Sequence, residues 1–242
     1  MYHPFSVAET TKTAWHIFRK NFVTIIVYSI ISFILLSILA VLTEFIITSD
    51  SFTAKMVISF ILIFVQAYTT LGLYKLIFTV IDSEYYEFEF SQVLPAIKMI
   101  FSYLIVIFLL AFLITSFHFL MVRIDDYPNI QTLIQDIFAI IGLAFALRTM
   151  FFITFIVDDN SGPFESLQQS FQLTSGYFFK VLTMLIIILV LIALPAILSQ
   201  YYPLISITII FTYPFVNIIL AVTYRKLVYS HQDVDDDIAE TN

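Results

Sequence analysis

The sequence predicts an all-α membrane protein: a polytopic helical bundle of six transmembrane helices arranged as three pseudo-repeats, each preceded by a short amphipathic interfacial helix. Composition is the first observation, because 60% of the 242 residues are hydrophobic, only 12% are charged and the mean hydropathy is +0.97. A soluble domain averages about 25% charged residues. The second observation is six apolar runs, each close to the roughly 20 residues that a bilayer-spanning helix requires. The third is a motif, an amphipathic segment before an apolar run, that recurs along the chain.

The chain opens with an amphipathic segment. Ser6 and Glu9 have the spacing of a capping box, with Ser6 as the N-cap. One helical stripe is apolar: Val7, Ala14, Trp15, Phe18 and Phe22. The basic side chains and a histidine lie mainly off that stripe: Lys12, His16, Arg19 and Lys20. A basic amphipathic helix of this kind is typical of the anionic inner surface of a membrane.

Six spans follow, at about residues 22–42, 56–81, 99–122, 133–157, 180–199 and 204–224. Residues 82–92 form an acidic, aromatic loop, and Ser91 is expected to cap a second short helix through Ile97 and Phe101. Residues 1–230 are thus expected to form a single membrane domain. Residues 231–242 are polar and acidic, and we expect them to be disordered.

The stretch between residues 148 and 180 carries the clearest copy of the motif. Ser161 or Gly162 is expected to cap a helix whose first turn holds Pro163 and Glu165. Its apolar side chains share one face: Phe164, Leu167 and Phe171. Gly176 is expected to end the helix in a left-handed conformation. Such a helix between two spans is interpreted as interfacial or re-entrant; the alternative is a loop helix packed on the bundle.

Aligned segments indicate an internal threefold repeat, with units at about 5–81, 90–157 and 161–226. Residues 9–22 and 165–178 match at four positions: Glu9 with Glu165, Ala14 with Ser170, Trp15 with Phe171, and Phe22 with Phe178. The middle copy, residues 91–104, keeps the apolar rhythm but lacks the glutamate. Each even-numbered span also carries a cation in the same half: Lys75, Arg148 and Arg225. Because two spans separate successive copies, the short helices are expected on one face of the membrane.

The basic residues indicate an orientation. Eight of them fall on one side of the predicted spans: Lys12, Arg19, Lys20, Lys75, Lys98, Lys180, Arg225 and Lys226. Lys55 and Arg123 fall on the other side, and Arg148 is left aside because it lies within a span. Lysine and arginine accumulate on the cytoplasmic side of membrane proteins. We therefore expect a multi-pass protein of the inner cell membrane with both termini in the cytoplasm.

Two segments carry a resemblance to a known family. FSVAETTKTAWHIFRKNF at residues 5–22 and RTMFFITFIVDDNSGPFESLQQSFQLTSGYFFK at residues 148–180 are the segments concerned. They resemble bacterial six-span inner-membrane proteins related to the membrane domain of glycerophosphoryl diester phosphodiesterases. The resemblance covers nearly the whole chain and implies a membrane module of unknown molecular function. In some family members a fused soluble phosphodiesterase domain supplies the chemistry; this chain is expected to have no room for one, so no active-site residues carry over.

Catalytic and metal-binding patterns are absent from the sequence, which has no cysteine, glycine-rich phosphate loop or serine-elbow motif. The four histidines are not expected to converge on one metal, because His118 falls on the opposite side of the predicted spans from the other three. The carboxylate pairs at 125–126 and 158–159 are interpreted as solvated turns, with a weak cation site as the alternative. We expect no enzyme activity, metal or cofactor. The formal net charge of −7 argues against a nucleic-acid partner.

Arg148 is the deepest cation in the chain. It precedes the end of the fourth span by nine residues and so lies roughly 13 Å deep, where an arginine is costly and should face protein or water. One interpretation is a structural arginine bonded to helix-end carbonyls, Gln66, Asn217 or Glu165; the other is a contact with a lipid phosphate or a substrate. Together with Lys75, these residues make up the candidate polar interior: Arg148, Gln66, Asn217, Lys75 and Glu165.

Two functions remain open from the sequence. The first is a non-enzymatic membrane module that organises lipid or partner proteins at the cytoplasmic face. The second is a small transporter or permease component with a polar interior around Arg148. Membrane lipids are the expected partners, and other membrane proteins are an open alternative. A cavity that reaches Arg148 favours transport, whereas a closed apolar bundle favours the module.

Overall fold

The computed structural model describes residues 6–47, 51–82, 93–124 and 127–240, and these ranges contain helices and no strand. The elements in chain order are α1 (Val7–Lys20), α2 (Phe22–Ile47), α3 (Phe52–Asp82), α4 (Ile97–Arg123), α5 (Pro128–Thr149), α6 (Phe152–Asp158), α7 (Pro163–Leu173), α8 (Phe178–Ser199), the 3-10 helix η2 (Pro203–Thr208) and α9 (Ile209–Glu240). Six candidate spans in this part of the chain are long and apolar enough to cross a membrane. The prediction of an all-helical protein with six such segments is therefore confirmed.

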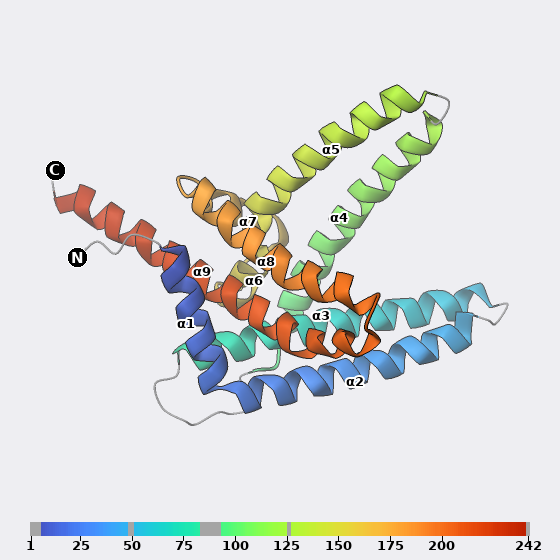
Figure 1. Cartoon of the computed structure of the whole chain (residues 1–242), viewed down its shortest axis with the longest axis horizontal. Coiled ribbons are helices and arrows are strands. Elements are labelled where there is room, and N and C mark those ends of the chain that lie inside the picture. The colour runs from blue at the N-terminus through green and yellow to red at the C-terminus, as the bar shows by residue number, and fades with distance from the viewer. Residues whose placement is uncertain (1–5, 48–50, 83–92, 125–126, 241–242) are drawn as a thin grey trace.

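The long helices form hairpins that share one end of the molecule. Figure 1 shows α2 and α3 as an antiparallel hairpin, and α4 and α5 as a second hairpin that diverges from the first. The beginning of α1 and the end of α9 lie on the same side of the picture, and α1 crosses that side at a steep angle to α2 (Figure 1). The C-terminal ends of α2 and α4 lie at the far tips of the two hairpins (Figure 1).

The core lies where α3, α6 and α9 pack against one another. Tyr74, Ile156 and Tyr224 are buried there. The diverging hairpin differs, because α5 buries only Leu147 and Thr149 among its described side chains. Phe117 of α4 and Phe138 of α5 stack with ring centroids 3.5 Å apart. Exposed apolar side chains on such helices match the hydrocarbon of a bilayer, which does not drive them inward as water does.

The expected fourth span, 133–157, is interrupted. It forms α5 and α6, with a break at Met150 and Phe151. The Ser170 hydroxyl of α7 donates to the Arg148 carbonyl at 2.7 Å and accepts from the Phe151 N–H at 3.1 Å. This one hydroxyl pairs with a backbone donor and a backbone acceptor at the break. The break is therefore stable, because buried backbone polar groups without a partner are costly.

Two further boundaries differ from the sequence analysis. Helix α9 extends to Glu240, past the expected end of the sixth span at residue 224, and the expected disorder of residues 231–242 stays a prediction. Neither proline nor glycine occurs between Phe215 and Glu240, so nothing in the backbone ends the helix earlier. The expected second short helix falls partly on residues 83–92, outside the described residues, and Ile97 already begins the long helix α4.

The expected caps of the short helices are partly realised. Ser6 is the N-cap of α1 but makes no side-chain cap hydrogen bond. In α7 the Glu165 carboxylate accepts from the N–H of the N-cap Gly162 at 3.1 Å, and Pro163 begins the helix as predicted. Gly176 has a φ of +83°, so the predicted left-handed conformation after this helix is confirmed.

Candidate functional site

The hydroxyl side chains of α7 face the protein, and its aromatic side chains face outward. Ser166, Ser170 and Thr174 recur every four residues and are completely buried. Phe164 and Phe171, on the predicted apolar face, are 67% and 40% exposed. Small hydroxyl side chains allow close approach to α6, which contacts α7. The Ser170 hydroxyl bonds to the backbone of the interrupted span, whereas Ser166 donates to the Pro163 carbonyl within α7. The two phenylalanines of the apolar face are thereby left exposed.

Arg148 binds the end of the same helix. Its guanidinium donates to the Thr174 hydroxyl over 3.3 Å, and that hydroxyl donates in turn to the carbonyls of Ser170 and Phe171, both at 3.1 Å. Thr174 is a partner that the sequence analysis did not name. The hydrogen bond from Arg148 to Thr174 is long, so we expect it to contribute little to the stability of the interrupted span.

A cluster that we call the charged junction joins the C-terminal ends of α3 and α6 to the middle of α9. It consists of Asp82 of α3, Asp158 of α6, and Tyr224 and Arg225 of α9. The Arg225 guanidinium lies 2.7 Å from the Asp82 carboxylate and 2.9 Å from that of Asp158. The Tyr224 hydroxyl donates to Asp158 at 2.8 Å. Arg225 thus pairs with carboxylates from two different helices, and one of these carboxylates also accepts a hydrogen bond from the Tyr224 phenol.

Aromatic rings surround the charged junction. The Tyr224 ring packs edge-on against Phe155 and Phe78, with centroids 4.9 and 5.9 Å away. The Arg225 guanidinium lies 5.0 Å from the centre of the Phe78 ring, within cation–π range. Its buried Nε has no hydrogen-bond partner among the described residues. These rings limit the access of water and strengthen the ion pairs.

Asp159 lies next to the junction. Partial burial raises the pKa of the Asp159 carboxyl above its ordinary value, and the neighbouring Asp158 charge raises it further. Arg225 acts in the opposite direction. The two carboxylates at 158–159, interpreted from the sequence as a solvated pair, therefore differ. Asp158 forms an ion pair with Arg225 of α9, and Asp159 is exposed.

Lys75 and Glu165 serve local structure. The Lys75 ammonium donates to the Leu94 carbonyl at 2.9 Å and so ties α3 to the segment before α4. Glu165 caps α7, as described above. Nearby, Lys98 donates to the Asn160 carbonyl at 3.1 Å, and Lys226 pairs with Glu9 of α1 at 2.8 Å. Lys75, Lys98 and Lys226, which the sequence predicts on the same side, thus bind a loop segment, a turn and a short helix.

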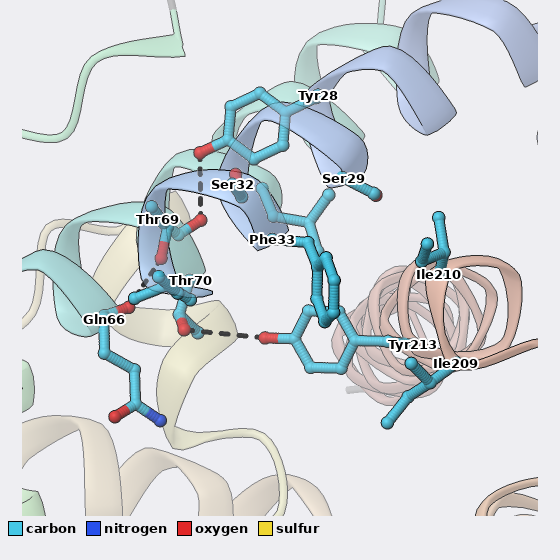
Figure 2. A pocket seen from close by; sticks show the side chains of 12 residues that line it. Tyr28, Ser29, Ser32, Phe33, Gln66, Thr69, Thr70, Ile209, Ile210 and Tyr213 are labelled. Atoms are coloured by element: carbon cyan, nitrogen blue, oxygen red, sulfur yellow. Dashed lines mark hydrogen bonds between the residues drawn. The ribbon is translucent and has the colours of Figure 1, made fainter. Parts of the chain in front are cut away.

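Gln66 and Asn217 line two adjoining cavities. A cavity of about 240 Å³ lies between α2, α3 and α9 and is lined in part by Gln66. A cavity of about 630 Å³ lies between α8, η2 and α9 and is lined in part by Asn217. Figure 2 shows hydroxyl side chains gathered around the smaller cavity, with the Gln66 amide extending away from them. Arg148, Lys75 and Glu165 line neither of these cavities, so the five candidates fall into two separate regions.

A glycine allows the close approach of Tyr28, one of the residues that line the smaller cavity. The Tyr28 hydroxyl donates to the Thr69 carbonyl at 2.9 Å across the α2–α3 interface. A Cβ atom on Gly72 would lie 2.2 Å from that hydroxyl oxygen, closer than two such atoms can approach. Gly72 is therefore required by the close approach of the tyrosine.

The sequence analysis missed the roles of Asp82 and Tyr224, although signals for both exist. A tyrosine precedes the cation at 74–75 and again at 224–225, and an aspartate ends both the second and the fourth span. No group of three or more histidine, cysteine or acidic side chains in the described residues could hold a metal ion. Comparison with family models, curated proteins and solved structures finds no match to this chain. The resemblance to the phosphodiesterase-associated membrane domains stays a prediction.

Proposed function

We propose that this chain is a non-enzymatic module that organises lipid at the cytoplasmic face of the inner membrane. The observation that carries the proposal is the packing of α1 and α7. Each helix buries small side chains spaced by four residues, Thr10 and Ala14 in α1 and Ser166 and Ser170 in α7. Trp15 of α1 and Phe164 and Phe171 of α7 are exposed, whereas Phe18 of α1 packs in the core. Exposed aromatic rings suit the interface between water and lipid.

Similar exposed fractions of aligned aromatic side chains support the expected similarity of the first and third repeats. Trp15 and Phe171, which align in sequence, are 54% and 40% exposed. Phe22 and Phe178, which also align, are both 41% exposed. The two helices thus offer equivalent aromatic surfaces, as a threefold arrangement of interfacial helices requires of its first and third members.

The basic side chains of α1 supply the headgroup chemistry. Lys12 and Arg19 are exposed, and each cation near a membrane surface attracts anionic lipid by about 1 kcal/mol. Their neighbour Trp15 holds the helix at the interfacial level. We therefore expect the module to retain anionic phospholipid in preference to zwitterionic phospholipid.

Native mass spectrometry of the full chain from nanodiscs of phosphatidylglycerol and phosphatidylcholine tests the proposal. The wild type should retain phosphatidylglycerol preferentially, and the double variant Lys12→Gln/Arg19→Gln should lose several-fold of it. The matched control, Lys55→Gln/Arg123→Gln, removes two cations from the other predicted side and should leave retention unchanged. Equal losses in both double variants, or no preference in the wild type, would refute a headgroup site on α1.

Orientation has its own test. Reporters fused after Asn242 and inserted near Asp50 should give opposite signals, with the C-terminal one cytoplasmic. A periplasmic C-terminus would exclude the proposed face even if the protein binds anionic lipid.

A second candidate function, a small permease, is favoured by the interrupted span. Discontinuous helices near polar residues are a feature of transporter folds, and α5 and α6 are separated directly after Arg148. Against it, Arg148 lines neither of the two cavities between the described helices. Uptake of small anions into proteoliposomes that depends on Arg148 would favour the permease over the module.

A further inference from the structure

The two cavities share a wall. The cavities adjoin, because four residues line both of them: Phe33, Ile209, Ile210 and Tyr213. Together they extend from the α2–α3 interface to the α8–η2 hairpin. This arrangement lies away from the interfacial helices and is independent of the lipid surface proposed above.

The cavities differ in polarity, and neither contains a charge. The larger one is lined mainly by apolar side chains of α8 and α9. The smaller one carries the hydroxyls of Tyr28, Ser32, Thr69 and Thr70 beside that of Tyr213 (Figure 2). No acidic, basic or histidine side chain lines either cavity among the described residues. Because a lipid phosphate or carboxylate needs a cation or several donors at this depth, the lining suits an uncharged ligand.

Proline adds a hydrogen-bond acceptor at the shared wall. Pro214 lies inside α9 and has no N–H, so the carbonyl of Ile210 lacks its usual i+4 donor. Ile210 borders both cavities. Tyr213, one residue before the proline, has a single long hydroxyl contact, 3.5 Å to Thr70, and so retains hydrogen-bonding capacity. A carbonyl that lacks its usual donor favours a ligand that donates a hydrogen bond.

We propose that the joined cavities bind an uncharged lipid with one hydrocarbon chain and a hydroxyl head. The chain occupies the larger cavity between α8, η2 and α9. The hydroxyl lies at the shared wall near Tyr213, where it donates to the Ile210 carbonyl. An ether or ester in the same place offers only acceptors, so the site distinguishes donors from acceptors and not merely polar from apolar heads.

Three photo-activatable probes with the same diazirine-bearing chain test the proposal: a primary alcohol, its methyl ether and the corresponding alkyl phosphate. They are applied to the full wild-type chain in phosphatidylcholine nanodiscs. The alcohol should label the protein about fivefold more than the ether, the change expected for one net hydrogen bond, and more than the phosphate. Labelled peptides should fall within residues 188–220. Equal labelling by alcohol and ether would mean that bulk acyl chains fill the space and would overturn the proposal, as would preferential labelling by the phosphate.

Two matched variants separate the cavity from the helix surface. Ala196 of α8 lines the larger cavity, whereas Ala193 lies exposed on the same helix and lines neither cavity. Ala196→Phe should abolish most alcohol labelling, and Ala193→Phe should preserve it; equal effects would contradict the site. Tyr213→Phe should reduce the difference between alcohol and ether. If Ala196→Phe melts early, competition on the wild type decides, because unlabelled alcohol must displace the probe several-fold better than unlabelled ether.

Discussion

Helix α9 contributes to two polar regions that differ in how their polar groups are used. At the charged junction, Arg225 and Tyr224 meet two carboxylates within 2.9 Å and are enclosed by aromatic rings. Twelve residues earlier along the helix, roughly 18 Å away, Tyr213 borders open cavities and makes only a 3.5 Å contact. Polar groups that already have partners hold the helices together, whereas polar groups that face a cavity can bind a ligand. We expect the first region to govern stability and the second to govern binding.

Among the substitutions that test this difference, Arg225→Met should have the largest effect on stability. Removing the guanidinium leaves the Asp158 carboxylate, 18% exposed, without its cation. The free energy of unfolding should fall by about 2–4 kcal/mol, in the range for breaking a partly buried ion pair. Thermal unfolding in detergent, followed by circular dichroism, measures the loss. Asp82→Asn is the graded control, because Asp82 is 54% exposed and its removal leaves the pair with Asp158; a loss as large as that of Arg225→Met would contradict the dominant role of Asp158.

Ser170→Ala should have the next largest effect, because it tests whether α7 secures the interrupted span. The substitution removes the hydroxyl that bridges the Arg148 carbonyl and the Phe151 N–H. Leaving these buried groups unpaired should lower the free energy of unfolding by about 2 kcal/mol. Ser175→Ala, at an exposed position, is the control and should change little. If both variants melt alike, the break does not depend on the Ser170 hydroxyl.

Near the smaller cavity, we expect stability to depend on how closely the side chains of α2 and α3 pack. Gly72→Ala places a Cβ atom against the Tyr28 hydroxyl and should cost about 1–2 kcal/mol of unfolding free energy through overpacking. In a Tyr28→Phe background the closest clash disappears, so the same substitution should cost less. Gly142→Ala, in open space on α5, should instead raise stability by up to about 1 kcal/mol. Additive losses in the Tyr28→Phe background would show that the hydroxyl is not the obstacle.

Sequence periodicity and composition predicted the helices well, and they located individual residues less well. Hydrophobic length alone identifies the six spans, because each helix must satisfy its own backbone in a bilayer. The interruption at Met150 was not predictable, since it depends on a serine from a different helix. Gln66 and Asn217 are polar residues within candidate spans, and nothing local to either residue specifies which helices surround it. The charged junction joins residues 143 positions apart, a distance over which a single sequence carries no pairing information.

The smallest expected effect concerns Asp159, at the margin of the charged junction. Its folded-state pKa is raised, mainly by burial and further by Asp158, so the folded protein disfavours the ionised carboxyl. This destabilisation is present above the folded-state pKa and disappears as the pH falls toward the unfolded value near 4. Asp159→Asn should therefore stabilise the protein at pH 7 by about 0.5 kcal/mol or less, discounted because the group is exposed. The difference in melting temperature between Asp159→Asn and wild type should shrink between pH 7 and pH 4. A gain that stays constant with pH, or a loss at pH 7, would mean that the Asp159 carboxylate contributes favourably to the junction, which would then extend one residue beyond Asp158.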